Sequence, residues 1–178
     1  TCTPADGATA SVAVAAGTFS DAVSNTNSVS NTYTWTYDGT GPTMAITSSS
    51  VTSGATTGTE AVALTFTSNE ATTDFIAGDI TASSCALSSL TGSSSTVYTA
   101  TCTPADGATA SVSVAAGEFS DAVSNTNSVS NTYTWTYDGT GPTMAITSSS
   151  VTSGATTGTE AVALTFTSNE ATTDFIAG

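Results

Sequence analysis

The sequence predicts an all-β fold built from tandem antiparallel β-sandwich modules. Its clearest feature is a repeat at a spacing of 100 residues, because residues 1–78 match residues 101–178 except at Ala13/Ser113 and Thr18/Glu118. Within the repeat, apolar residues alternate with Thr, Ser and Ala over short runs, which is the period of strands with one buried face. No segment has a helical period of useful length.

The module boundary is predicted in the sequence Tyr-Asp-Gly-Thr-Gly-Pro-Thr, which occupies 37–43 and recurs at 137–143. The glycines relax the backbone and the proline removes a ladder donor, so this stretch reads as a short hinge between strands. The chain then divides into the C-terminal part of one module (1–38), a complete module (39–138) and the N-terminal part of the next (139–178). We therefore expect a segment of a longer tandem array.

Within the complete module, about seven short strands are expected, with turns every 8–12 residues. This pattern predicts a two-sheet antiparallel sandwich of immunoglobulin type. The expected strand regions are 44–46, 61–68, 75–80, 85–90, 96–103, 110–114 and 129–137, and the longest loops are 48–59 and 117–128.

The alternation also predicts which side chains face the core. In residues 61–68, for example, Leu64 should be buried and Thr65 should face outward. The predicted core is Met44, Ile46, Val62, Leu64, Phe66, Leu87, Val112, Val114 and Trp135.

The chain has three cysteines, but the 100-residue repeat shows that each whole module carries an even number. Cys2 is equivalent to Cys102, so a whole module carries two cysteines, Cys85 and Cys102. A hairpin loop centred on 91–95 places Cys85 opposite Cys102, and opposed residues are close enough for a disulfide. We expect this disulfide, a partner for Cys2 outside the sequence, and an oxidising extracellular setting.

The charge pattern excludes several functions. The chain has no Lys, Arg or His against fourteen Asp and Glu, for a net charge of −14. Nucleic-acid binding and docking on anionic lipid both need cations, and Ser/His or Cys/His catalysis lacks its base. No apolar run approaches the ~18 residues of a membrane helix, so no membrane insertion is expected in this segment.

An acidic surface can attract cations instead. Following the strand directions places acids of adjacent modules together at each junction, where they could offer the six to eight oxygens that calcium prefers. The candidates are Asp6, Asp38, Glu70 and Asp121 at the first junction, with Asp106, Asp138 and Glu170 at the second. No EF-hand pattern is present, and solvated surface charge is the competing interpretation. No cofactor is otherwise required.

Several stretches together resemble bacterial-type Ig-like tandem repeats of giant surface adhesins and extracellular fibre proteins. They are AVALTFTSNEATTDF (61–75), Gly-Asp-Ile (78–80), YTATCTP (98–104), FSDAVSNTN (119–127) and the hinge. The resemblance covers the whole module. It implies modules stacked as spacers, sometimes rigidified by calcium between domains.

The function expected from these observations is an extracellular structural repeat, a stalk or fibre-forming segment whose partners are neighbouring identical modules. Lateral copies in a filament would fit the same sequence. The alternative is an adhesive module that contacts a glycan or protein partner repeat by repeat, for instance through the Thr-x-Thr run at 132–136. An enzyme is not expected, because a string of identical acids at fixed spacing serves a tether better than a catalyst.

Overall fold

The structure, a computed structural model, describes residues 1–176, which form thirteen β-strands and one short 3-10 helix. The chain separates into two compact units, the first ending at Asp138 and the second beginning at Gly139.

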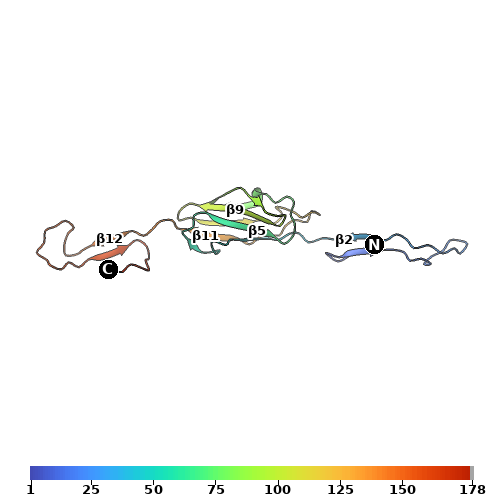
Figure 1. The fold of residues 1–178 in the computed structure, drawn as a ribbon, viewed down its shortest axis with the longest axis horizontal. Helices are drawn as coiled ribbons and strands as arrows, with labels where there is room; N and C mark the ends of the chain where they lie inside the picture. The colour runs from blue at the N-terminus through green and yellow to red at the C-terminus, as the bar shows by residue number, and fades with distance from the viewer. Residues whose placement is uncertain (177–178) are drawn as a thin grey trace. The chain divides into compact units, whose positions relative to one another are not determined.

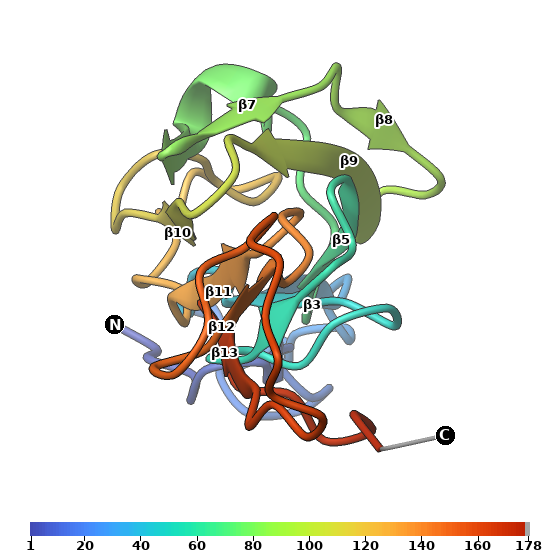
Figure 2. The same cartoon turned by 90° about the vertical axis from the view of Figure 1, so that its left-hand side faces the viewer.

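The complete module is a sandwich of two sheets (Figures 1 and 2). One sheet has the order β3-β5-β9-β7, with β8 also paired to β9, and the other has the order β4-β11-β10-β6. All pairs are antiparallel except β4 with β11. The first sheet comprises β3 (Met44–Thr47), β5 (Val62–Ser68), β7 (Cys85–Leu87), β8 (Thr91–Gly92) and β9 (Val97–Pro104). The second comprises β4 (Thr56–Thr57), β6 (Ile80–Ser83), β10 (Thr109–Val114) and β11 (Tyr133–Tyr137).

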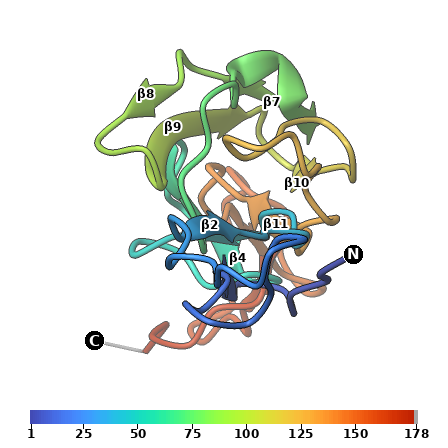
Figure 3. The ribbon, with the colours of Figure 1, turned by 90° about the vertical axis from the view of Figure 1, so that its right-hand side faces the viewer.

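This strand order confirms the predicted immunoglobulin-type sandwich. The chain crosses between the sheets after β3, so that β4 lies in the other layer beside β11. Viewed from the opposite side, β7, β8 and β9 again lie in one layer with β10 and β11 in the other (Figure 3).

Three predicted strand regions are shorter than expected. Strand β7 ends at Leu87, although the predicted region runs to residue 90. The 3-10 helix at Ala77–Asp79 occupies much of the 75–80 region, and strand β6 begins only at Ile80. In the last region, Ser130 and Asn131 bond outside the ladder: Ser130 Oγ accepts from Val114 N (2.8 Å), and the Asn131 amide donates to Ile46 O (2.9 Å) and accepts from Ile46 N (2.7 Å). Strand β11 therefore starts at Tyr133.

The core lies between the two sheets. The predicted strand phase is correct, because Leu64 is fully buried and Thr65 is only half-buried. Every predicted core residue is buried except Leu87, which is half-buried because β7 is an edge strand. The structure adds Val51, Phe75, Ile80, Ala100, Cys102, Ala110, Phe119 and Tyr133.

The predicted disulfide between Cys85 and Cys102 is present, with the two Cα atoms 5.7 Å apart. The predicted register was wrong by two residues, since Cys102 pairs with Leu87 and Cys85 pairs with Pro104. The turn at 93–97 lies further along the chain than the assumed loop centre, so the disulfide joins diagonal neighbours of β7 and β9. Cys2 is free and exposed.

The terminal segments form two further antiparallel pairs. Strands β1 (Thr9–Val12) and β2 (Tyr33–Thr36) pair in the register of β10 and β11, and β12 (Met144–Thr147) and β13 (Thr165–Ser168) pair in the register of β3 and β5. Their apolar side chains, buried in the complete module, are largely exposed here.

Candidate functional site: an acidic cluster at the 38–43 linker

The site is built on the loop 117–128. The side chains of Asn127 and Asp121 fix the conformation of this loop through hydrogen bonds to its backbone. Asn127 is 3% exposed, and its Oδ1 accepts from the backbone N of Glu118 (2.8 Å) and Phe119 (3.0 Å). Its Nδ2 donates to Ala115 O (2.7 Å) and Ser128 O (2.8 Å), so the side chain has every partner it can use. Asn127 thus closes the two ends of the loop.

Asp121 organises the tip of the same loop. Its Oδ1 accepts from Val123 N and Asn125 N, both at 2.9 Å, and its Oδ2 accepts from Asn125 Nδ2 at 2.9 Å. The Asp121 side chain is 6% exposed, which fixes the orientation of a buried carboxylate near the linker.

The linker at 38–43 is packed against this loop. Asn125 Nδ2 donates to Asp38 O (3.1 Å), and Ser128 N donates to Pro42 O (3.0 Å). A Cβ added at Gly41 would lie 2.0 Å from Thr126 O, so only glycine permits this approach. The predicted hinge is therefore anchored to the module that follows it.

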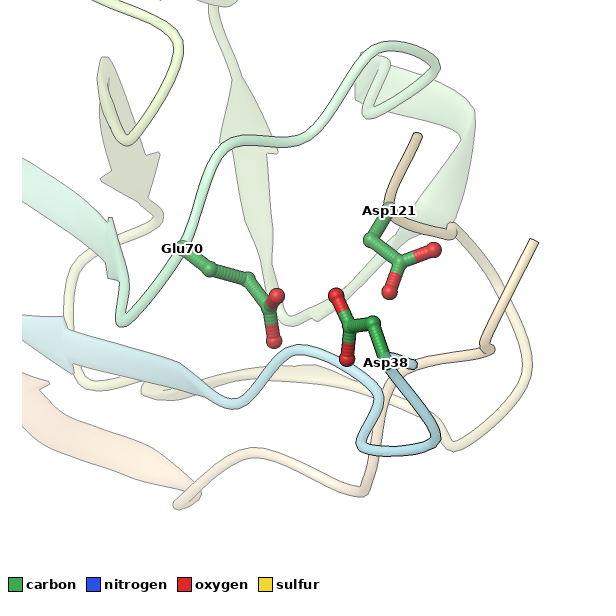
Figure 4. A group of neighbouring side chains, drawn as sticks. All are labelled: Asp38, Glu70 and Asp121. Atoms are coloured by element: carbon green, nitrogen blue, oxygen red, sulfur yellow. The ribbon is translucent and has the colours of Figure 1, made fainter. Parts of the chain in front are cut away.

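Anchoring brings three of the predicted acids together (Figure 4). One carboxylate oxygen from each of Asp38, Glu70 and Asp121 lies within 4.8 Å of the other two. Asp38 comes from the linker, Glu70 from the turn after β5, and Asp121 from the loop before β11. These residues belong to three separate segments, and Asp38 is exposed while Glu70 is half-buried.

The electrostatics of the cluster are unbalanced, because the chain contains no basic side chain. Burial first, and then the charges of Asp38 and Asp121, raise the pKa of Glu70 above its ordinary value. Burial also acts to raise the pKa of Asp121, but the hydrogen bonds from Asn125, Val123 and Ser124 outweigh it and lower that pKa overall. Of these two carboxylates, Glu70 therefore accepts a proton more readily than Asp121.

Asp6 lies outside the close group and braces the linker. Its carboxylate accepts from Thr40 Oγ1 and from Gly39 N (2.6 Å), and these hydrogen bonds lower its pKa. Its charge also contributes to the raised pKa of Glu70. The fourth predicted residue of the first junction thus supports the cluster without joining it.

The second predicted set is divided between the two units. Asp106 and Asp138 belong to the first unit and Glu170 to the second, so their proposed convergence stays a prediction.

The chemistry of the donor set fits a hard cation. Each of the three residues offers one carboxylate oxygen to the group, and oxygen is the ligand type that calcium prefers. The Asp121 oxygens already accept hydrogen bonds from the loop, as preorganised ligand oxygens commonly do. Asp38, Glu70 and Asp121 are the residues that would hold the ion.

The comparison with known families agrees with this architecture. A model described as "Bacterial Ig-like domain" matches residues 38–137, which is more than half of the chain. The chain belongs to the bacterial Ig-like domain family. Bacterial Ig-like domains are generally structural or adhesin-type modules and typically occur in extracellular or surface proteins. No curated protein and no solved structure matched the chain.

Over residues 1–176 of this bacterial Ig-like chain, no helix has the length and apolar character needed to cross a bilayer.

Sequence reasoning found the acids of the site but missed Asn125, Asn127 and Gly41. The spacing Asp-x-x-x-Asn-x-Asn at 121–127 is a usable signal, because Asp and Asn side chains that bond nearby backbone are typical of structured loops.

Proposed function

We propose that this chain is part of an extracellular stalk or fibre in which identical Ig-like modules set length and stiffness. The observation that carries the proposal is the anchored linker. A complete sandwich is joined to the preceding repeat through a segment whose glycine, proline and carbonyl groups are packed against the 117–128 loop. Flexible tethers leave such glycines unpacked, whereas a spacer that holds its length needs its linkers fixed.

The scaling of size with repeat number tests this function. Polypeptides of two, four and eight modules should show a maximum dimension in small-angle X-ray scattering that grows by a constant increment per module. Growth close to the square root of module number would contradict a stiff spacer. Neutral surface changes such as Thr67→Ser, on an exposed strand position, should leave the scaling intact.

We also propose calcium at the junction cluster. A bound divalent cation would compensate three carboxylates that otherwise repel one another, and would tie the linker to the Glu70 turn and the 117–128 loop. A cation bound by all three carboxylates requires the linker to lie against the Glu70 turn and the 117–128 loop. Cation binding should therefore stabilise this packed arrangement of the linker by linkage.

The calcium proposal is tested by melting and scattering on a two-module polypeptide with calcium or chelator. Calcium should raise the melting temperature and lengthen the particle, and Asp38→Asn should blunt both responses. Asp79→Asn is a control for lost charge, because Asp79 lies in the 3-10 helix outside the cluster. Superimposable curves with calcium and with chelator would contradict the proposal.

One observation favours the second candidate, an adhesive module. A hollow of about 330 Å³ opens beside β8 and β9, lined by Phe75, Ile76, Leu90, Gly92 and Tyr98 among others. An aromatic-lined hollow is a common site for a sugar ring or an apolar side chain. A Tyr98→Ala variant that loses adhesion while keeping the scattering increment would favour this candidate over the spacer.

A further inference from the structure

The hollow beside β8 and β9 lies wholly within the complete module, at an irregular edge of its first sheet. Strands β7 and β8 both pair with β9 (Figure 2). Along this edge the chain advances four residues, from Leu87 to Thr91, while β9 advances three, from Cys102 to Thr99. The edge therefore carries one extra residue, which makes it a β-bulge. The bulge bends the edge away from β9, and Leu90 within it lines the hollow of about 330 Å³.

Tyr98 of β9 supplies an aromatic wall that is fixed in place. Its hydroxyl group is hydrogen-bonded to Thr72 Oγ1 at 2.7 Å, and Thr72 is 4% exposed. Phe75 makes an edge-type contact with the Tyr98 ring, with the centroids 5.0 Å apart, and makes a second such contact with Phe119 at 5.0 Å. Because the hydroxyl group is already used, the part of Tyr98 that remains for a ligand is the ring itself.

Gly92 leaves space beside that ring. It is paired with Tyr98 across β8 and β9, and a Cβ added at Gly92 would lie 3.3 Å from both Cδ1 and Cε1 of Tyr98. The φ angle of Gly92 is not positive, so the backbone conformation does not require glycine here. The missing side chain therefore keeps one side of the Tyr98 ring open.

The lining of the hollow is uncharged, since it consists of aromatic, aliphatic, glycine and serine residues. The nearby acids are bonded elsewhere: the Asp74 carboxylate accepts from Ser120 N and Oγ, both at 2.9 Å, and Asp79 Oδ2 accepts from Ile76 N at 2.8 Å. The chain has no basic side chain to pair with an anionic ligand, and the lining has no carboxylate to pair with a cation. The hollow is therefore suited to a neutral ligand.

The shape of the site favours a compact ring over an extended peptide. A peptide that adds to a sheet needs an uninterrupted row of free backbone groups along the edge, and the bulge between β7 and β8 interrupts that row. The volume is at the low end of the ~300–1,000 Å³ of ligand pockets, which is enough for one ring. A sugar ring has both an apolar C–H face and hydroxyl groups, and it would meet both apolar and hydroxyl-bearing residues in this lining.

We propose that this hollow binds one neutral pyranose ring at the end of a glycan. The C–H face of the sugar lies against the Tyr98 ring, with Ile76 and Leu90 beside it and the Ser89 hydroxyl group at the rim. A ring of about a dozen non-hydrogen atoms should bind with a Kd on the order of 1–10 mM. The proposal deepens the adhesive candidate and does not rest on the spacer function.

Saturation-transfer difference NMR on the 178-residue chain tests the site. The probes are free glucose, galactose, mannose and N-acetylglucosamine, with N-acetyl-leucine amide as a probe for an apolar side chain. At least one sugar should receive saturation, strongest at the C–H protons of one ring face, and the leucine probe should receive none. Absence of transfer to every sugar, or transfer to the leucine probe alone, overturns the proposal.

Two variants locate the binding site. Gly92→Ala adds a methyl group beside the Tyr98 ring and should weaken sugar binding about fivefold. Ile76→Ser removes a wall residue that is 61% exposed, so it should also weaken binding while the fold is kept. The matched controls are Gly58→Ala, where an added Cβ comes no closer than 3.7 Å to its neighbours, and Val123→Ser, at a 58% exposed position outside the lining.

Both controls should bind the sugar as the parent does, and melting curves check that all four variants are folded. Unchanged binding in both Gly92→Ala and Ile76→Ser overturns the assignment of the sugar to this hollow. A negative sugar test leaves the scattering test of the spacer function unaffected. It also leaves the adhesive candidate to its own criterion, the loss of adhesion in Tyr98→Ala.

Discussion

The complete module and the terminal segments place the same residues in two environments. Phe119 is 2% exposed in the module, whereas Phe19 is 64% exposed in the first segment. Likewise, Tyr133 is 6% exposed and Tyr33 is 68% exposed. The sequences around these pairs are identical apart from positions 13/113 and 18/118. Burial in this fold is therefore decided by the covering sheet.

Local geometry, in contrast, is the same in both environments. Strands β1 and β2 keep the register of β10 and β11, and Ser24 and Ser124 have φ values of 71° and 72°. Asn27 makes the same four hydrogen bonds in its segment as Asn127 makes in the module. Turns and hairpins follow from nearby residues, while the stability of the sandwich comes from contacts between distant strands.

The largest effect is expected from truncating equivalent leucines. Leu64→Ala should cost about 2–5 kcal/mol of unfolding free energy, because it opens a cavity in a fully buried site. Leu164→Ala should change the main transition by less than about 0.5 kcal/mol, since that side chain is already exposed. Chemical denaturation at low protein concentration measures both, and equal losses would contradict the comparison.

Replacing the equivalent loop asparagines, Asn127 and Asn27, should give a smaller difference in unfolding free energy than replacing the leucines. Asn127→Ala removes partners from buried backbone groups and should cost about 1–3 kcal/mol, whereas Asn27→Ala should leave the main transition in place. Asn127→Ala should also weaken any calcium response, because the same loop positions Asp121. An Asn27→Ala variant that melts earlier than Asn127→Ala would show that the segments support the module.

The fold was largely predictable because its signals are short-range. The alternation in 61–68 set the strand phase correctly. The hairpin register was missed because a serine-rich turn leaves the loop centre undetermined by sequence. Of the site, the acids could be predicted from strand directions, but the packing of Gly41 on Thr126 depends on a contact 85 residues away in the chain.

The smallest expected change in stability is that of a substitution at Glu70. Its raised pKa means that the folded state binds the proton more tightly than the unfolded state, so its contribution to stability falls as pH rises from 4.5 toward the raised value. In calcium-free buffer at neutral pH, Glu70→Gln should raise the melting temperature slightly, by about 2 °C, because it relieves repulsion by Asp38 and Asp121.

That gain should vanish in acid below the Glu70 pKa, where the native residue is protonated. Asp6 and Asp121 act in the opposite sense: their lowered pKa values give stability above 3.8 that is lost as pH falls. Glu60→Gln, at an exposed position outside the cluster, is the control for the loss of one negative charge. Destabilisation by Glu70→Gln at neutral pH in chelator would contradict the repulsion account.

Stretching an array of modules by atomic force microscopy tests most directly the central claim, that each 100-residue repeat is one independently folded structural unit. The Cys85–Cys102 disulfide spans 17 residues of sequence, so only about 83 residues per module should extend, adding up to ~290 Å of contour length at ~3.5 Å per residue. Replacing both cysteines by serine should lengthen every step by about 50–60 Å. Equal, evenly spaced unfolding steps with that increment are the predicted result. A smooth extension without steps, or steps unrelated to the 100-residue repeat, would contradict the account.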